Sequence, residues 1–576
     1  MVKKQMGRRE FLRFAGLGAA AAVVAACQPE VVVETVVKEV EKVVKETVIV
    51  DGEERVVERI ITVMPEAPAS VVTAPGSFPI VEDRVTLSII AAGKRDFNEN
   101  SWTQWLEEQT NIDIVYDMAL EPDSQVKLNT MVTAGDLPDV IAYFYLSLAE
   151  QQVLAEQGVV IPLNDLIEQH GFESKMMLNK HPEIREQLTL ADGQFYSMWA
   201  YATVGHVALS HKAWINQAWL DTLGLPMPQT TEEYREVLRA FKTGDPNGSG
   251  TADEIPLSGN TGSWAEPDRF LMNSFVFASR MQSDNLMIED GVIKASYADP
   301  GWREGVKYMN SLFSEELLDP QMFTQDREQC RALAENDPNL LGSIQQLWYG
   351  MFTNWGGGSG RWLEYRPIPP LEGPTGLRQT PWDPYQPLDT GNWLITKNCE
   401  HPEIPFRLAD FMYSEEATLR NNYGVPGLDW RYGEPGEVAI HGGQARFAML
   451  RPWGTDPDTY MNVAVDYEPP ELRYGSIALE GDLETDLYRV SMNFYAPYGV
   501  QDKILPPLAF TAEQANELGE LETVVNSYKD QSFAEFVTGG LDPEQDWETY
   551  LERLNGLGLQ RYLEIYQEAY DAKMGA

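Results

Sequence analysis

The sequence predicts an α/β protein built of two lobes. Strand-like and helix-like segments alternate between residues 84 and 156, an order typical of a parallel sheet with crossover helices. The chain has 576 residues, more than a single hydrophobic core usually organises. It contains three cysteines, too few for a disulfide framework or a cysteine-based metal cluster. Ordinary hydrophobic cores must therefore stabilise each lobe.

Residues 1–26 predict an export signal. Basic residues cluster at its start, and an uncharged run follows from Phe14 to Ala26. The pair Arg8–Arg9 followed by Phe11 resembles a twin-arginine signal, and the residues up to Cys27 resemble a bacterial lipobox. The uncharged run has only about half of the roughly 20 residues that a membrane span needs. We expect cleavage before Cys27, lipid on Cys27, and a protein outside the cytoplasm that this lipid alone holds at the membrane.

Residues 27–83 predict a spacer. Valines in the run 31–45 recur at three- and four-residue spacing, which permits an amphipathic helix or coiled coil. Asp51-Gly52 lies between two valine-rich runs and equally favours a β-hairpin. Both alternatives stay open at this stage. Four prolines between residues 65 and 79 end any regular structure, and we place the start of the first lobe near Arg84.

The elements that follow Arg84 alternate between the two hydrophobic periods. An apolar–polar alternation or a short apolar run indicates a strand, and spacing of three and four residues indicates a helix. Parallel strands bring their carboxyl ends to one edge of the sheet, which we expect to form the rim of a cleft. Strands are predicted at 85–90, 112–116 and 139–143, and helices at 102–109, 125–133 and 148–156.

The charge balance restricts the partners. The chain has 44 Lys and Arg residues against 88 Asp and Glu residues, a net charge of −44 at pH 7. Such a surface repels phosphate backbones, which excludes nucleic acid, and it disfavours a strongly acidic ligand. The 15 Trp and 25 Tyr residues favour a neutral, ring-shaped ligand, because aromatic faces stack on the C–H faces of sugars. A carbohydrate is therefore the expected ligand class.

The segment Asp245–Glu254 predicts a cation-binding loop. Side-chain or backbone oxygens occur at nearly alternate positions around a turn that contains two glycines. Hard oxygen donors in this pattern suit Ca²⁺, and Gly250 occupies the sixth position as in an EF-hand loop. Position 12 is Pro256 rather than glutamate, and a solvated turn is the alternative. The expected ligands are Asp245, Asn247, Ser249, the Thr251 carbonyl, Asp253 and Glu254.

Five stretches in order carry a family resemblance. They resemble the family 1 extracellular solute-binding lipoproteins of ABC importers, a group that includes alginate-oligosaccharide-binding proteins. Each stretch alone is a weak signal, whereas the ordered set covers most of the chain. The stretches are Gly135–Val140 with a Gly-Asp-x-Pro-Asp turn, Asp192–Tyr196, Asp245–Pro256, Tyr423–Trp430 and Asp546–Tyr570.

The resemblance implies a fold and a role. The fold is that of periplasmic binding proteins, with two discontinuous α/β lobes joined by crossover hinges near residues 199–207 and 390–395. The implied role is a monomeric receptor that captures a carbohydrate, in particular an oligosaccharide, and delivers it to an ABC permease. In the family, the acid at the position of Glu254 is a bidentate ligand of a structural Ca²⁺. The implied lobes are 84–200 plus 392–450 and 201–391 plus 451–576.

Six aromatic residues are candidates for the ligand site. Some occur at the implied crossovers, some beside glycine-rich turns, and one occurs where related sugar-binding proteins carry a stacking aromatic. For each, a place in the core is the alternative. The candidates are Trp199, Tyr201, Trp264, Trp348, Trp355 and Trp393.

The sequence contains few motifs that are typical of enzymes. His206 and His211 are five residues apart, whereas the metalloprotease motif needs four, and no P-loop, G-x-S-x-G or dinucleotide fingerprint precedes a predicted helix. With 88 acidic residues, carboxylate pairs arise by chance. We expect no enzymatic activity. The alternatives are an exported glycoside-processing enzyme and a peptide-binding receptor of the same architecture.

Overall fold

The computed structural model describes residues 40–50, 53–63, 71–120, 123–190, 192–202, 204–262, 264–266, 268–281, 283–385, 388–453, 455–461 and 465–575. The chain divides into two compact units, residues 1–70 and 71–576. The predicted export signal and Cys27 lie outside the described residues. Within the described part, no helix has the length and apolar character needed to cross a membrane.

The first unit contains a β-hairpin. Strands β1 (Val40–Val50) and β2 (Glu53–Val63) pair antiparallel, with Val50 opposite Glu53. This register leaves two connecting residues, 51–52, as the hairpin alternative predicted. Valine has a branched Cβ that favours strands over helices, which is consistent with the hairpin rather than the helix or coiled coil.

The first lobe of the second unit begins before Arg84. Val72, Ile80 and Val81 are buried in its core. Arg407 donates hydrogen bonds to the carbonyl oxygens of Thr73 at 2.7 Å and Ser77 at 3.1 Å. The predicted start was therefore about a dozen residues late. The segment has neither a helix nor a strand, so no hydrophobic period could indicate that it packs into the lobe.

The first lobe is organised by a six-stranded sheet. Strands β3 and β4 are parallel, as are β3 and β5, while β14 runs antiparallel to its neighbours β5 and β6. The carboxyl ends of β3, β5 and β6 therefore share one edge with the start of β14. The strand order is β17 (Tyr467–Glu468), β6 (Ser197–Ala202), β14 (Leu388–Ile395), β5 (Val140–Ala142), β3 (Val85–Gly93) and β4 (Ile112–Leu120).

Helices of the first lobe cover this sheet. All three predicted helices form, and the predicted strands correspond to β3, β4 and β5. Helix α4 begins with a capping box between Ser147 and Glu150, which satisfies two amide groups at its first turn. The helices are α2 (Ser101–Thr110), α3 (Ser124–Ala134), α4 (Leu148–Glu156), α5 (Asn164–His170), α6 (Glu173–Lys180), α7 (Glu183–Leu188), α14 (Glu403–Met412) and α15 (Glu415–Tyr423).

The second lobe has a smaller, four-stranded sheet. Strand β11 is parallel to β8 and antiparallel to β7, and β12 is antiparallel to β7. The carboxyl ends of β8, β11 and β12 thus share an edge with the start of β7. The order is β12 (Tyr365–Ile368), β7 (Ala213–Asn216), β11 (Leu341–Gln345) and β8 (Ile255–Ser258).

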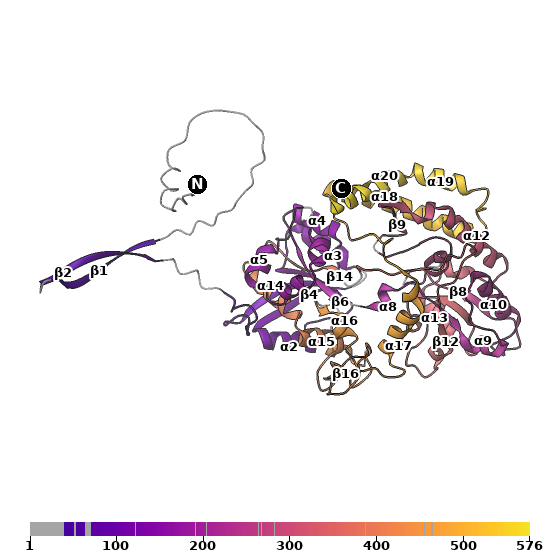
Figure 1. The fold of residues 1–576 in the computed structure, drawn as a ribbon, viewed down its shortest axis with the longest axis horizontal. Coiled ribbons are helices and arrows are strands. Elements are labelled where there is room, and N and C mark those ends of the chain that lie inside the picture. The colour runs from indigo at the N-terminus through magenta and orange to yellow at the C-terminus, as the bar shows by residue number, and fades with distance from the viewer. Residues whose placement is uncertain are drawn as a thin grey trace, which may run out of the picture. The chain divides into compact units, whose positions relative to one another are not determined.

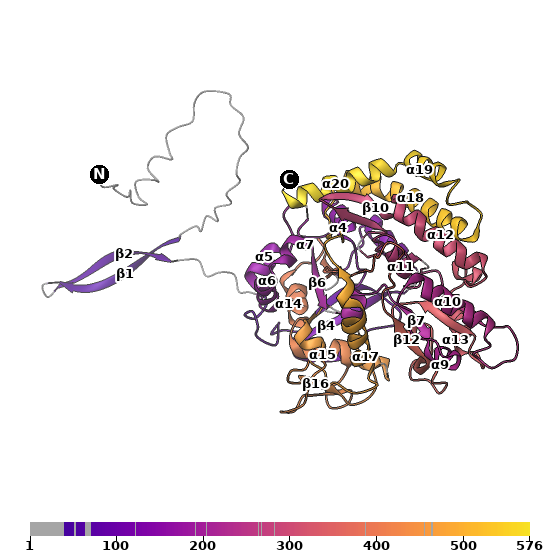
Figure 2. The same ribbon diagram turned by 45° about the vertical axis from the view of Figure 1, so that its right-hand side comes forward.

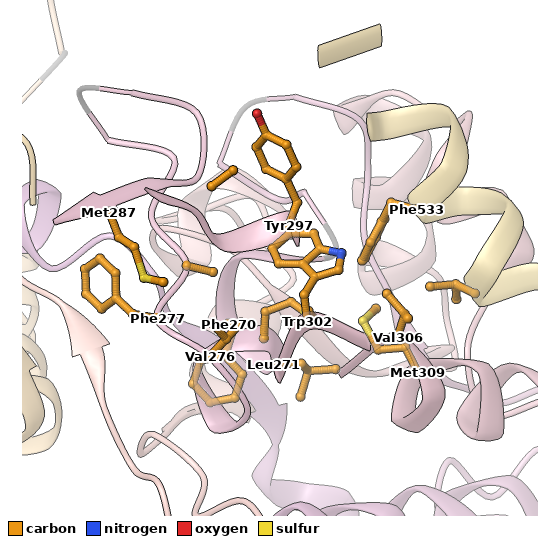
Figure 3. Packing of buried hydrophobic residues seen from close by; sticks show 14 of the residues in the cluster. Phe270, Leu271, Val276, Phe277, Met287, Tyr297, Trp302, Val306, Met309 and Phe533 are labelled. Atoms are coloured by element: carbon orange, nitrogen blue, oxygen red, sulfur yellow. The ribbon is translucent and has the colours of Figure 1, made fainter. Parts of the chain in front are cut away.

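A large apolar core lies under the helices of the second lobe. Figure 3 shows Trp302 of α12 packed among Tyr297, Phe533 and neighbouring aliphatic side chains. The C-terminal helices α18 and α20 lie beside α12 and β10 (Figures 1 and 2), and α18 also contacts α4 of the first lobe. The elements are α9 (Gln217–Leu223), α10 (Thr231–Thr243), α11 (Asp268–Leu271), β9 (Leu286–Glu289), β10 (Val292–Ala295), α12 (Pro300–Ser314), α13 (Arg327–Glu335), α17 (Leu483–Val490), α18 (Ala512–Thr538), α19 (Trp547–Gly556) and α20 (Leu559–Met574).

The chain passes between the two sheets more than once. It leaves β6 at Ala202 and enters β7 at Ala213 through the short helix α8 (Gly205–Ala208), where the first crossover was predicted. It returns before β14 and leaves the first lobe again after β17 and α16 (Pro470–Arg473). Both lobes are thus discontinuous. The predicted boundary at residue 451 does not match the sheet, because β17 pairs with β6 in the first lobe.

The remaining strands are short. Strand β13 (Thr380–Pro381) pairs in parallel with β18 (Gly499–Val500), which lies close to the crossings. Strands β15 (Trp430–Tyr432) and β16 (Phe447–Met449) form an antiparallel pair within the segment that precedes β17. This segment has a small core of its own around Trp430 and Phe447.

Candidate ligand-binding site

A polar pocket lies at the carboxyl edge of the first sheet, where the chain crosses between the lobes. Its volume is about 140 Å³. It combines the ends of β5, β6 and β17 with the start of β14, and Val204 adds a residue of the crossing itself. The lining residues are Tyr145, Ala200, Ala202, Val204, Asp389, Asn421, Asn422, Asp466, Glu468 and Arg473. In open α/β sheets this edge is the usual place for a ligand.

Two carboxylates of the pocket are buried and hydrogen-bonded. Asp466 accepts a hydrogen bond from the Asn422 side-chain amide at 2.8 Å. Glu468 accepts hydrogen bonds from the Tyr423 hydroxyl at 2.6 Å and from Arg473 at 3.0 Å. Burial raises the pKa of Asp466 to about 7, with the charge of Glu468 as the next contribution, and burial also raises the pKa of Glu468. Desolvation therefore outweighs the hydrogen bonds at both groups.

Arg473 is ion-paired with two glutamates. Besides Glu468, its guanidinium donates two hydrogen bonds to Glu484, at 3.0 and 2.7 Å. This fork arrangement fixes the guanidinium plane against a carboxylate. The positive charge in the pocket wall is thus already neutralised, so it does not offer a free site for an acidic ligand.

Tyr145 and Asp389 form the open side of the pocket. Tyr145 has 49% of its surface exposed, and Asp389 is also exposed. Even so, the surrounding protein removes water from both, which raises the pKa of each side chain. Groups that solvent can reach but that protein largely surrounds lie in a cleft. Here a tyrosine ring and a carboxylate lie side by side, so that an aromatic face and a hydrogen-bond acceptor are offered to the same ligand.

The backbone at Tyr145 is held in an uncommon conformation. Tyr143 and Tyr145 have φ angles of 64° and 53°, in the left-handed region. Such residues cost on the order of 1–3 kcal/mol each and gather at functional sites. Gly391 of β14 holds the geometry, because a Cβ there would lie 2.2 Å from the Leu146 carbonyl oxygen. The glycine lets β14 approach the chain at Leu146 and so brings Asp389 towards Tyr145.

The Asp245 loop has the oxygen donors that a calcium site requires. Asp253 accepts hydrogen bonds from Asn247 at 2.8 Å, from Ser249 at 2.9 Å and from the Thr251 hydroxyl at 3.1 Å, so four of the six predicted ligand residues lie together. Gly248 and Gly250 have φ angles of 70° and 76°, which allow the tight turn.

Glu254 gives the loop an unsatisfied anion. Both of its carboxylate oxygens are buried and have no hydrogen-bond partner in the described structure. Burial raises its pKa more than the nearby backbone amides of Glu254 and Asn247 lower it, and the charges of Asp253 and Asp245 add to the rise. Among the described residues, no three His, Cys, Asp or Glu side chains cluster closely enough to hold a metal by themselves. A Ca²⁺ bound here would therefore take part of its coordination from amide, hydroxyl and carbonyl oxygens.

A larger cavity of about 520 Å³ adjoins the Asp245 loop. Ile255 and Pro256, at the amino end of β8, contribute to its wall together with residues of α12 and the turn after it. All of its lining residues belong to the second lobe. It therefore lies at the sheet end opposite to the crossings, and we do not assign the ligand to it.

The comparison with protein families decides the classification. The model of the bacterial extracellular solute-binding protein family matches residues 101–424. The chain belongs to this family. The family resemblance predicted from the sequence is thereby confirmed.

Individual solute-binding proteins resemble the chain over most of its length. FusA, the fructooligosaccharide ABC transporter substrate-binding protein of Streptococcus pneumoniae, is 28% identical over 510 residues, 86% of this chain and 91% of FusA. The FusA structure in complex with kestose superimposes with a TM-score of 0.72 at 26% identity, over 85% of this chain and 99% of that chain. An alginate-binding protein, AlgQ2 without calcium ion, shares the fold with a TM-score of 0.64 at 22% identity, over 85% and 99% of the two chains.

Two of the predicted ligand residues are core residues in this solute-binding protein. Trp199 and Trp393 have 0% of their surface exposed and pack in the core of the first lobe. Trp199 packs between Phe195 and Tyr413. Neither indole offers a face to a ligand, which corrects the expectation from the sequence. Crossover strands are also central strands of the sheet, so their large side chains fill its core.

Tyr201 lies on the opposite side of its strand from the pocket. Its neighbours Ala200 and Ala202 line the pocket. The Tyr201 ring instead packs against His181 and Tyr467, with ring centres 4.4 Å and 5.7 Å apart.

Trp264, Trp348 and Trp355 belong to the second lobe. Trp264 follows β8 and Trp348 follows β11 in the chain. Both therefore come from loops at the carboxyl edge of the second sheet, where β7 begins. Trp348 and Trp355 are half-buried with ring centres 6.3 Å apart, and the guanidinium of Arg269 lies 5.0 Å from the Trp264 ring. None of the three lines the 140 Å³ pocket. They remain proposals for contacts made from the second lobe.

The sequence prediction missed the polar lining. Asn421 and Asn422 directly precede Tyr423–Trp430, one of the five family stretches, and this position was the available signal. Asp389 precedes the predicted crossover at residue 390. Asp466 carried no signal, because one carboxylate among 88 acidic residues is not distinctive.

Proposed function

We propose that the protein is a receptor for a neutral carbohydrate, in particular an oligosaccharide, which it delivers to an ABC permease. The observation that carries the proposal is the pocket at the crossing, where Tyr145 offers a ring face and Asp389 offers a carboxylate. Membership of the solute-binding family and the similarity to FusA support a transport role. Closure of the two lobes about the crossings would cover the ligand.

The charge of the pocket supports a neutral ligand. Three carboxylates line it, and its one lining arginine is paired with Glu468 and Glu484. A uronic acid placed here would add a negative charge to a pocket in which burial already disfavours the charged forms of Asp389, Asp466 and Glu468. Like charges in a low-dielectric pocket repel strongly, so oligosaccharides of uronic acids should bind poorly.

The test is a binding panel with product analysis. Purified protein is titrated calorimetrically with fructo-, malto- and galacturono-oligosaccharides and with short peptides, and the sugars are then analysed by mass spectrometry. Binding of a neutral sugar that stays intact supports the proposal. Hydrolysis of the sugar would establish the glycoside-processing alternative, and binding of peptides or polyuronates alone would refute the ligand class.

We also propose a structural Ca²⁺ in the loop Asp245–Glu254. Asp245, Asn247, Ser249, Asp253, Glu254 and the Thr251 carbonyl would hold it, and the unpartnered Glu254 carboxylate supports this assignment. A FusA structure is of an EF-hand mutant in complex with fructo-nystose, which places an EF-hand in a relative. When bound, the ion would neutralise the loop carboxylates and fix the loop. We propose no part for it in binding the sugar.

Finally, we propose that Cys27 carries lipid and anchors the receptor on the extracytoplasmic side of the membrane. The supporting observation is the lipobox-like sequence after the basic, apolar export signal. Cys27→Ala should move the protein from the detergent phase to the aqueous phase in a detergent-partition assay. Retention of the variant in the detergent phase would refute the anchor.

A further inference from the structure

The pocket is small for an oligosaccharide. Its volume of about 140 Å³ is below the roughly 300–1,000 Å³ typical of small-molecule sites. It therefore has room for about one sugar ring. If the ligand is a chain of sugars, its remaining rings must contact surfaces beside the pocket. An exposed aromatic residue that is attached to the pocket wall would be such a surface.

Trp453 is attached to the pocket wall. Its indole Nε1 donates a hydrogen bond of 3.0 Å to the carbonyl oxygen of Asn422, whose side chain lines the pocket and holds Asp466. Trp453 comes from the loop after β16 and is 45% exposed. The chain thus brings a large, partly open ring next to Asn422 from a segment about 30 residues away. No local sequence pattern indicates this place for Trp453, because it depends on this tertiary contact.

The Trp453 ring is fixed from its other side. It packs on Tyr460 with ring centres 5.5 Å apart, and the guanidinium of Arg95 lies 5.4 Å from the Tyr460 ring. Arg95 and Asn100 also hold the Tyr460 carbonyl oxygen by hydrogen bonds. Arg95 follows β3 and so belongs to the same sheet edge as the pocket. A ring held in one orientation loses little conformational entropy when a ligand stacks on it.

We propose that Trp453 is the platform for a second sugar ring, so that the receptor takes one end of an oligosaccharide in its pocket and the adjoining ring on Trp453. The inference rests on the proposed carbohydrate function and adds to it a minimum ligand length of two rings. The pocket then recognises the end of the chain through Tyr145, Asp389 and Asn422. Trp453 contributes apolar contact that a monosaccharide cannot reach.

The experiment measures affinity against ligand length. Wild type, Trp453→Ala and Trp453→Phe are titrated with fructose, kestose and nystose, and with glucose, maltose and maltotriose as a second neutral series. Tyr432→Ala is the control, because Tyr432 is an aromatic residue of the same segment with 52% exposure that does not line the pocket. The Phe variant keeps a ring but loses the hydrogen bond to Asn422. It thereby separates stacking from support of the pocket wall.

The expected result is a loss that depends on ligand length. Trp453→Ala should weaken trisaccharide binding at least tenfold and change monosaccharide binding less than threefold. Trp453→Phe should restore most of the affinity, and Tyr432→Ala should match wild type. An equal loss for all lengths, or none, overturns the inference while leaving the carbohydrate function intact. If wild type binds no sugar of either series, the proposed function fails and the inference fails with it.

Discussion

The Asp245 loop and the pocket at the crossing each contain three acidic residues, yet the pKa values of these residues shift differently in the two sites. In the loop, Asp253 is surrounded by side-chain donors of its own segment, which hold its pKa below the usual value. In the pocket, burial raises the pKa of Asp389, and at Asp466 and Glu468 it outweighs the hydrogen-bond donors that lower the pKa. The number of acidic residues in a site therefore does not decide their charge state. The balance between donors and lost water decides it.

Glu254 connects the two cases. It belongs to the loop by sequence, but its carboxylate is buried without a hydrogen-bond partner in the described structure, and burial raises its pKa as it does for the pocket carboxylates. The loop is therefore satisfied at Asp253 and unsatisfied at Glu254. A bound cation would neutralise Glu254 and so remove this difference. In the pocket, the hydroxyl groups of a ligand would donate hydrogen bonds to the carboxylates.

The largest effect should come from removing the cation. At a free Ca²⁺ concentration about one hundred times the dissociation constant, binding to the folded state stabilises it by about 2.7 kcal/mol. Chelation should lower the unfolding free energy of wild type by that order, and Asp245→Ala with Glu254→Ala should abolish the response. Urea unfolding with and without chelator measures it, with the exposed Glu552→Ala as control. A wild type that unfolds identically in both conditions would show that the loop is a solvated turn.

The next effect concerns the pocket. Tyr145→Ala should weaken binding of the preferred oligosaccharide by about 2 kcal/mol, roughly thirtyfold, since desolvated aromatic anchors dominate affinity. Calorimetry measures the change, and the chelator response of this variant should equal that of wild type. An unchanged affinity would remove Tyr145 from the site and leave Trp264, Trp348 and Trp355 as the aromatic candidates.

An effect that is smaller within any one pH unit separates the two sites by pH. Because the pKa of Asp466 is raised to about 7, the folded state binds a proton more tightly than the unfolded state. Stability from this group is therefore present at low pH and is lost as the pH rises from about 4 to 7, by up to about 1.4 kcal/mol per pH unit. Glu468, Asp389 and Arg473 also act on this group. Asp253 has a lowered pKa and the opposite sign, losing its contribution as the pH falls.

Asp466→Asn should remove that pH dependence, because asparagine can still accept the hydrogen bond from Asn422 but does not titrate. Urea unfolding at pH 5, 6 and 7 compares the variant with wild type. Equal slopes for the two proteins would contradict the assignment of the raised pKa to Asp466.

The smallest effect should come from Ser249→Ala. The Ser249 hydroxyl donates to Asp253 at 2.9 Å in a partly buried part of the loop. A hydrogen bond of this kind contributes about 0.5–1.5 kcal/mol net, and access of water to the loop places it at the lower end. In chelator, the variant should unfold within about 1 kcal/mol of wild type, while its midpoint for Ca²⁺ should rise. A variant whose calcium response matches wild type would exclude Ser249 as a ligand.

Local patterns determined what the sequence could predict. The three helices and three strands at the start of the first lobe followed from hydrophobic period, because each period is set by residues within one element. The Asp245 loop could be proposed as a cation site for the same reason, since all six proposed ligands lie within ten residues. The first crossover was also located, through the family stretches on either side of it.

The pocket depends on packing between distant segments. Tyr145, Asp389, Asn422 and Asp466 meet there from four segments, and sheet order brings β17 next to β6. The same sheet order buries Trp199 and Trp393 and turns Tyr201 away, although all three are aromatic residues at crossovers. Which side chains are buried, and which face of the sheet each one lies on, depends on which strands become neighbours. Packing between segments hundreds of residues apart decides the strand neighbours. Patterns within short segments thus predict the family and the elements of the first lobe and propose the Asp245 loop as a cation site, whereas packing between distant strands decides which residues can touch a ligand.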